Sequence, residues 1–156
     1  MRKTTIAIAF LVAAACAKTV KVETDPSAAK ADVDIQAPGA PETWSGTLAA
    51  VGTSGISGTA QGTTANDASH VTINISGATS GSTHPWHVHE GKCGDASPPI
   101  VGDASAYPPL VVGAGGTATA TAHLSVKLNE AKNYIVNVHA SPTNLGTIVA
   151  CGDYND

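Results

Sequence analysis

Residues 117–126, Thr-Ala-Thr-Ala-Thr-Ala-His-Leu-Ser-Val, decide the fold class of this chain. Polar residues at the odd positions alternate with Ala, Leu and Val at the even positions. Successive side chains of a β-strand point to opposite faces of its sheet. The stretch therefore predicts a strand with one face in a core and the other in solvent. Its small inner residues predict a tightly packed interior.

The same texture extends over most of the chain. Short runs rich in Val, Ile, Thr and Ala alternate with breaks of Gly, Ser, Asn and Asp. These patterns predict an all-β domain, a Greek-key β-barrel or sandwich of seven to eight antiparallel strands. The longest gap, residues 91–116, is expected to be one loop. The expected strands cover residues 43–51, 56–62, 69–76, 84–90, 117–126, 133–139 and 147–151.

Composition limits the function classes. The chain has 156 residues, 8 Lys+Arg and 12 Asp+Glu, a formal net charge of −4, and 13% charged residues. That length allows one domain of ordinary size. The low charge argues against a coiled coil or a helix bundle. The acidic balance without a basic cluster excludes nucleic acid as an expected partner.

The first sixteen residues are expected to be a signal peptide. Arg2 and Lys3 precede an apolar run over residues 6–15, which is too short to span a bilayer. Two cleavage sites are open. The run Ala15-Cys16-Ala17 fits an ordinary signal peptidase. Residues 13–16, Ala-Ala-Ala-Cys, resemble a bacterial lipobox, in which Cys16 is lipidated and tethers the protein to a membrane.

Both cleavage sites place the mature protein outside the cytoplasm, in the bacterial cell envelope, the periplasm or the extracellular space. Residues 17–41, which hold three prolines, are expected to be a flexible linker before a β-domain over residues 42–156. Removal of the residues before Cys16 takes away Lys3 and the only arginine, Arg2, so the net charge falls from −4 to −6.

The two remaining cysteines, Cys93 and Cys151, are an even pair in an oxidising compartment. They are expected to form a disulfide that ties the end of the chain to its middle. The alternative is a pair of free thiols.

Two histidines two positions apart mark the expected site. His87 and His89 lie in the run 83–90, Thr-His-Pro-Trp-His-Val-His-Glu. On a strand they point to one face, while Trp86 and Val88 point into the core. Paired neutral imidazoles suit copper or zinc. The alternative is a pair of exposed surface histidines.

His139 ends the expected strand over residues 133–139 and supplies a third ligand if that strand neighbours residues 84–90. His70 and His123 are expected to be structural or surface histidines.

Together these motifs resemble the copper/zinc superoxide dismutase family, whose fold is a Greek-key β-barrel. The resemblance covers about residues 43–152. The matching motifs, in chain order, are His84-Pro85-Trp86-His87-Val88-His89-Glu90, Cys93, Val138-His139-Ala140, Leu145-Gly146 and Val149-Ala150-Cys151-Gly152.

The resemblance implies copper as the cofactor, and superoxide or copper ions as the partners. It implies that Cys93 and Cys151 form the disulfide of that family. His84 matches a structural histidine beside the copper strand, and Trp86 takes the place of the usual Phe. Three residues match copper ligands: His87, His89 and His139.

The sequence departs from that family at the zinc site and at the catalytic arginine. Pro99 stands at the position of the metal-bridging histidine, and residues 91–116 contain no histidine. Asp103 could match the zinc aspartate, but a zinc site needs about four ligands, so zinc is not expected. Ile148 stands at the position of the arginine.

Two functions therefore remain open: a copper-only superoxide dismutase of reduced efficiency, and a non-catalytic protein that holds or buffers copper. A barrel without a physiological metal is a third alternative. The feature that distinguishes them is a fourth donor beside the three histidines. A fourth donor favours catalysis, while a closed pocket of three nitrogens favours copper holding.

Overall fold

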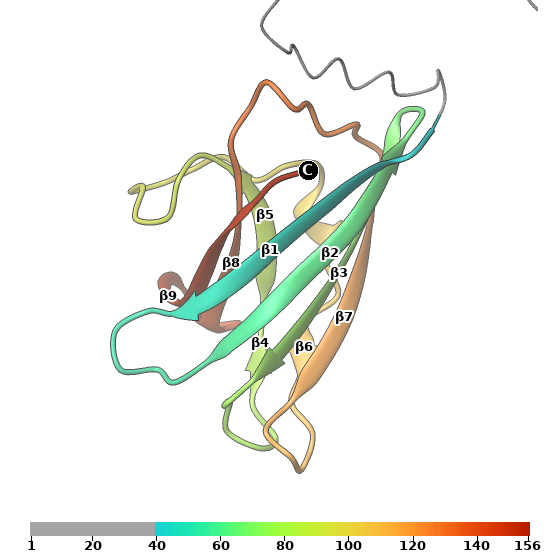
Figure 1. The fold of residues 1–156 in the computed structure, drawn as a ribbon. Helices are drawn as coiled ribbons and strands as arrows, with labels where there is room; N and C mark the ends of the chain where they lie inside the picture. Colours follow the sequence, from blue (N-terminus) through green and yellow to red (C-terminus); the bar gives the residue numbers. More distant parts are fainter. Residues whose placement is uncertain (1–39) are drawn as a thin grey trace, which may run out of the picture. The chain divides into compact units, whose positions relative to one another are not determined.

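The structure is a computed structural model that describes residues 40–156 (Figure 1). The expected signal peptide over residues 1–16, with Cys16, and most of the expected linker over residues 17–41 lie outside the described residues.

The described residues form nine strands and no α-helix. One turn of 3-10 helix, η1, covers Ala104–Ala106. The part of the chain that the structure describes has no helix long and apolar enough to cross a membrane. The strands are β1 Glu42–Ala50, β2 Ser57–Ala65, β3 Ala68–Ser76, β4 Thr83–His84, β5 Trp86–Glu90, β6 Leu110–Val111, β7 Ala118–Leu124, β8 Tyr134–Ser141 and β9 Asn144–Tyr154.

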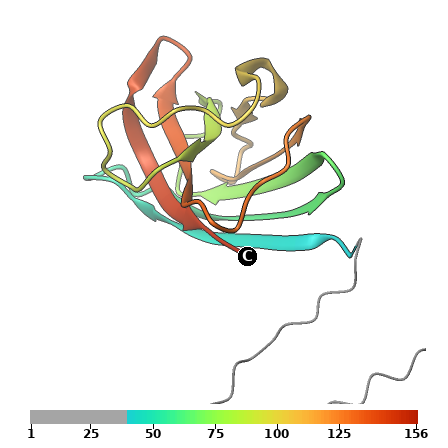
Figure 2. The ribbon, with the colours of Figure 1, turned by 90° about the horizontal axis from the view of Figure 1, so that it is seen from above.

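Seven strands form one antiparallel sheet in the order β5-β8-β9-β1-β2-β3-β7, and β4 pairs with β6 separately. The large sheet curls into a half-barrel (Figure 2). Strands that follow one another in the chain, such as β7 and β8, lie far apart in this order. Such crossing connections are typical of Greek-key topologies. The prediction of an all-β, antiparallel fold is confirmed.

The strands β3 and β7 show why alternation predicts this sheet. Every second residue of each strand is buried, and the residues between them are exposed or half-buried. In register, Val71 lies opposite Ala122 and Ile73 opposite Ala120, so large inward residues on β3 meet small ones on β7. This pairing of large with small residues gives the close packing that the alanines predict.

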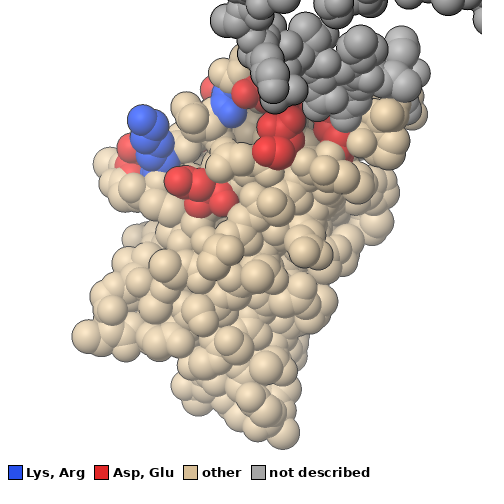
Figure 3. Space-filling view, viewed as in Figure 1, with Lys and Arg blue, Asp and Glu red and all other residues tan. Residues whose placement is uncertain are grey.

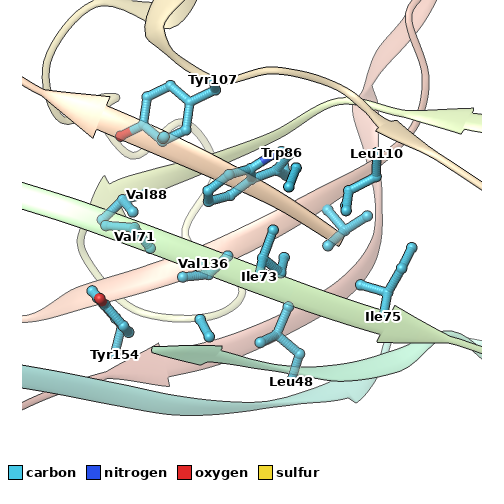
Figure 4. Close-up of a cluster of buried hydrophobic side chains, with 14 of the residues drawn as sticks. Leu48, Val71, Ile73, Ile75, Trp86, Val88, Tyr107, Leu110, Val136 and Tyr154 are labelled. Atoms are coloured by element: carbon cyan, nitrogen blue, oxygen red, sulfur yellow. The ribbon is translucent and has the colours of Figure 1, made fainter. Parts of the chain in front are cut away.

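The core fills the concave side of the sheet (Figure 4). Trp86 and Val88 on β5 are completely buried, as predicted. The indole of Trp86 meets the ring of Tyr107 edge to face, with centroids 5.1 Å apart. Around them pack the buried side chains of Leu48, Val71, Ile73, Ile75, Leu110, Val136 and Tyr154.

The structure corrects one expected loop and the bounds of one expected strand. The gap over residues 91–116 is not one loop, since it contains η1 and the strand β6. Both elements are too short to show a periodicity. The expected strand over residues 147–151 is too short, because β9 begins at Asn144 and continues to Tyr154, whose side chain is fully buried, and Asn155 pairs with Ser45 of β1.

Candidate metal centre

Three histidines that are distant in sequence meet in one buried cluster. His87 and His89 come from β5 and His139 comes from the adjacent strand β8. One ring nitrogen of each lies within 4.8 Å of the others, and the three side chains are 5–8% exposed. The structure therefore brings together the three residues that the sequence singled out as ligands. It does not leave His87 and His89 exposed on a surface.

An irregularity in β8 places His139. Its pairing with β9 shifts register between Val138 and His139, and again between His139 and Ser141. Such bulges bend a strand locally and redirect side chains. The N–H of His139 donates to the carbonyl of Pro85 at 2.8 Å, and its carbonyl lies 2.9 Å from Nδ1 of His84.

His84 is therefore a clamp on the backbone of His139. Its other ring nitrogen lies 2.9 Å from the hydroxyl of Ser82, and the side chain is buried. One ring nitrogen is thus bonded to the His139 carbonyl and the other to the Ser82 hydroxyl, so neither is free to bind a metal ion. His84 does not join the cluster of His87, His89 and His139.

Hydrogen bonds to the backbone orient two of the three rings. Nδ1 of His89 lies 2.8 Å from the carbonyl oxygen of Pro98, and Nδ1 of His139 lies 2.6 Å from that of Leu145. Because a carbonyl only accepts, both Nδ1 atoms carry the proton, and both Nε2 atoms present a lone pair. Backbone partners of this kind fix the tautomer of a metal-binding histidine.

Nε2 of His89 is buried and has no hydrogen-bond partner among the described residues. A buried polar atom without a partner costs stability, and a bound ion is one explanation for such an atom in a native protein. Nδ1 of His87 lies 3.0 Å from Nε2 of His139. Since that Nε2 carries a lone pair, His87 donates its Nδ1 proton to it. A metal ion bound there would take the place of this proton, while the proton of His87 moves to Nε2.

Burial keeps the cluster neutral. Desolvation, followed by the charges of His139 and His89, lowers the pKa of His87 to about 4. Burial also lowers the pKa of His89 and His139, although the Pro98 and Leu145 carbonyls oppose that shift. At neutral pH all three imidazoles therefore hold lone pairs, as metal ligands must.

The segment after β5 covers the site. The N–H of Glu90 donates to the carbonyl of Pro99 at 3.0 Å, and the N–H of Val101 donates to Val88 at 2.9 Å. Residues 98–101 thus run along the free edge of β5. Further along, Tyr107 stacks its ring edge to face on His87, with centroids 5.2 Å apart. Sequence reasoning missed Tyr107, whose only signal was an aromatic residue in a proline-rich segment.

Among residues 40–156 no fourth His, Cys, Asp or Glu joins the cluster. Pro99 is held by its backbone beside β5 and has no donor side chain. Asp103 is exposed and caps η1, accepting a hydrogen bond from the N–H of Ser105 at 2.8 Å, which holds the pKa of Asp103 below its usual range. Ile148 lies opposite His139 in the β8–β9 register, so this apolar side chain occupies the neighbouring position.

The disulfide joins Cys93, just after β5, to Cys151 in the middle of β9, with Cα atoms 6.0 Å apart. It fixes the start of the segment that carries Pro98, the partner of His89. The predicted pairing is present, and a disulfide is typical of an oxidising, extracytoplasmic compartment.

Positive charge is scarce around this fold. Residues 40–156 contain three lysines, eight carboxylate side chains and no arginine. Lys127 and Lys132 are paired with Glu42 and Glu90, each at 2.7 Å. On the face shown in Figure 3, the charged side chains gather near the end at which β1 begins, and the rest is uncharged. Such a surface does not attract an anion over long range.

The other two histidines lie outside the cluster. His70 on β3 and His123 on β7 are exposed, as expected, but they lie opposite each other on adjacent strands and contact each other.

The chain matches no protein-family model and no curated protein sequence. The structure itself shows an antiparallel β half-barrel with a buried cluster of three histidines that could hold a metal ion.

Proposed function

We propose that this protein holds copper outside the cytoplasm, at a site made of His87, His89 and His139. The single observation that carries the proposal is the cluster itself: three buried, neutral ring nitrogens converge without a fourth protein donor. The buried and unpartnered Nε2 of His89 indicates that the cluster is built for something the protein must bind.

The donor set favours Cu(I). Imidazole nitrogen suits copper, zinc and nickel, but Cu(II) and Ni(II) prefer four donors in a tetragonal arrangement. Structural zinc sites use about four tetrahedral protein ligands. Three buried nitrogens satisfy a three-coordinate Cu(I) ion without any further ligand, whereas Zn(II), Cu(II) and Ni(II) need water or another donor to complete their coordination. Copper holding is therefore the function that this geometry supports best.

The resemblance to the copper/zinc superoxide dismutase family supports the same ligands, because the motif order matches that family. The disulfide between Cys93 and Cys151 supports an extracytoplasmic location. We further propose that the domain is held in the bacterial cell envelope, through lipidation of Cys16.

Dismutation of superoxide is the second candidate, and the motif order around His87 and His89 favours it. Three observations weigh against efficient turnover. The cluster lacks a fourth donor, Ile148 stands where that family has its arginine, and the described residues carry more negative than positive charge. An anionic substrate would meet the wrong long-range field.

The copper proposal is tested by titrating Cu(I) into purified protein against a competing chelator. The wild-type protein is expected to hold one tightly bound ion per chain. His89→Ala should weaken binding by more than about 100-fold, because the loss of an outer partner of a ligand already costs about 10–100-fold. The matched control is His123→Thr, which removes an exposed histidine and should leave Cu(I) affinity unchanged. Equal affinities for His89→Ala and wild type would refute the site.

The two functions are separated by measuring superoxide loss with the copper-loaded protein. If the protein only holds copper, the copper-loaded protein should remove superoxide no faster than a control sample of the same protein loaded with Ag(I) in place of copper. A rate that rises with copper-loaded protein and disappears in His89→Ala would establish dismutation instead.

A further inference from the structure

A second pair of histidines lies on the outer face of the sheet. His70 on β3 and His123 on β7 are directly opposite in register, and their Nδ1 atoms are 2.6 Å apart. The ring centroids are 4.5 Å apart and the planes are nearly perpendicular. Both side chains are exposed, and β7 is an edge strand of the large sheet. The pair is therefore open to solvent and to a ligand.

The neighbouring rungs of the same two strands show what is unusual about this pair. The Thr72 and Thr121 hydroxyls are 2.8 Å apart, and the Thr119 hydroxyl donates to the Asn74 amide oxygen at 2.7 Å. In each of those cross-strand pairs a hydroxyl donor meets an oxygen acceptor. In the histidine rung two ring nitrogens share one proton, and a metal ion that accepts both lone pairs can replace it.

The distance between the nitrogens favours a particular ion. Bonds of about 2.0–2.1 Å from metal to nitrogen place two ligands about 2.9 Å apart at a right angle and about 3.4 Å apart in a tetrahedron. The two Nδ1 atoms must move apart by a few tenths of an ångström to bind an ion at a right angle. They must move further apart to bind an ion with tetrahedral geometry. Right-angled nitrogen ligands are the geometry of Cu(II) and Ni(II).

We propose that His70 and His123 form a second metal site, a surface chelate for a divalent transition-metal ion with Cu(II) preferred and water completing the coordination. The backbone pairing of β3 and β7 places His70 and His123 opposite each other before the ion arrives, so less ordering is needed on binding. The buried cluster offers three nitrogens in a nearly closed pocket. The surface pair offers two nitrogens with room for water. The protein would thus hold both oxidation states of copper, each at its own site.

The site is tested by Cu(II) titration of the purified wild-type protein, His123→Thr and the control Thr121→Val. Threonine keeps a β-branched side chain on the strand, like its neighbours, so His123→Thr removes the imidazole without disturbing the sheet. The wild type should bind about one more Cu(II) per chain than His123→Thr, and Thr121→Val should bind as the wild type does. Unchanged Cu(II) stoichiometry in His123→Thr would overturn the proposal.

A second measurement does not depend on the buried cluster. Excess Ni(II) should raise the thermal midpoint of the wild type, since an ion that binds only the folded chain stabilises it. That shift should vanish in both His70→Thr and His123→Thr and persist in His89→Ala. A shift that persists in His70→Thr would contradict the site. If Cu(I) binding failed at the buried cluster, the difference between wild type and His123→Thr would still decide the surface site.

Discussion

The two ends of the large sheet differ in the burial of successive residues along their strands. In β3 and β7, at one end, buried and outward-facing residues alternate along each strand. In β5 and β8, at the other end, nearly every residue is buried, including the polar side chains of His87, Asn137 and His139. The first region has one face in solvent, while the second is covered on both faces.

That difference explains where each kind of histidine lies. On the alternating strands, His70 and His123 take outward positions and stay in solvent. On β5, His87 and His89 also point away from the core, but the segment with Pro98 and Tyr107 covers them. An outward position therefore becomes a buried site only where an irregular segment packs over the sheet.

The largest expected effect comes from removing the side chain that joins the covered strand to its cover. Trp86 is completely buried and its indole N–H donates to the carbonyl of Pro108 at 2.8 Å. Trp86→Ala should lower the free energy of unfolding by about 3–5 kcal/mol. On the alternating strands, the smaller change Ile73→Val should cost about 0.5–1.5 kcal/mol. Urea denaturation of both variants checks these values, and a loss below about 1 kcal/mol in Trp86→Ala would show that this side chain does not hold β5 to the segment that covers it.

The disulfide is the next largest contribution to the covered region. Loss of the bond, in Cys93→Ser with Cys151→Ser, removes a constraint on a loop of 58 residues. The chain-entropy argument predicts a loss of about 4 kcal/mol. The thermal midpoint of this variant should fall clearly, and Cu(I) affinity should fall with it because Pro98, which orients His89, loses its anchor. A variant with an unchanged midpoint and affinity would show that the bond supports neither.

A smaller effect is expected from the clamp on His139. His84→Ala removes a buried imidazole that contacts the His139 carbonyl and the Ser82 hydroxyl. The unpaired carbonyl should cost about 1–3 kcal/mol of stability. Cu(I) affinity should fall less than in His89→Ala, since no ligand is lost. Cu(I) binding by folded His84→Ala as weak as that of His89→Ala would contradict a role limited to positioning His139.

The most gradual effect, spread over more than two pH units, is a pH dependence of the metal-free protein. The pKa of His87 is lowered by burial to about 4, whereas an unfolded histidine titrates near pH 6.5. Below about pH 6.5, His87 takes up a proton in the unfolded chain but not in the folded chain. The free energy of unfolding therefore falls as the pH drops toward about 4. His87→Gln should show a shallower fall in urea denaturation over that range. Identical slopes would mean that His87 is not buried as a neutral ring.

The sequence predicts the alternating region well and the covered region only in part. Alternation over residues 117–126 was sufficient to place β7, because one face of that strand meets water. The motif spacing identified His87, His89 and His139. Tyr107 could not be predicted, because the short elements that pack over β5 show no hydrophobic periodicity in the sequence.

The end of β9 was missed for a similar reason. Residues 152–156, Gly-Asp-Tyr-Asn-Asp, are polar in composition, and the one apolar contact that continues the strand is the buried ring of Tyr154. The pairing of His70 with His123 also lay beyond the sequence, because it depends on which strands are neighbours and on their register.

The most direct test of the central claim is X-ray absorption spectroscopy of the protein loaded with one Cu(I) per chain. The measurement is made in the His123→Thr background, so that the surface pair contributes nothing. We predict a three-coordinate ion with imidazole nitrogens only, and loss of one nitrogen scatterer in His139→Ala. A fourth protein donor, a sulfur ligand or an unchanged spectrum in His139→Ala would contradict a closed site of three histidines.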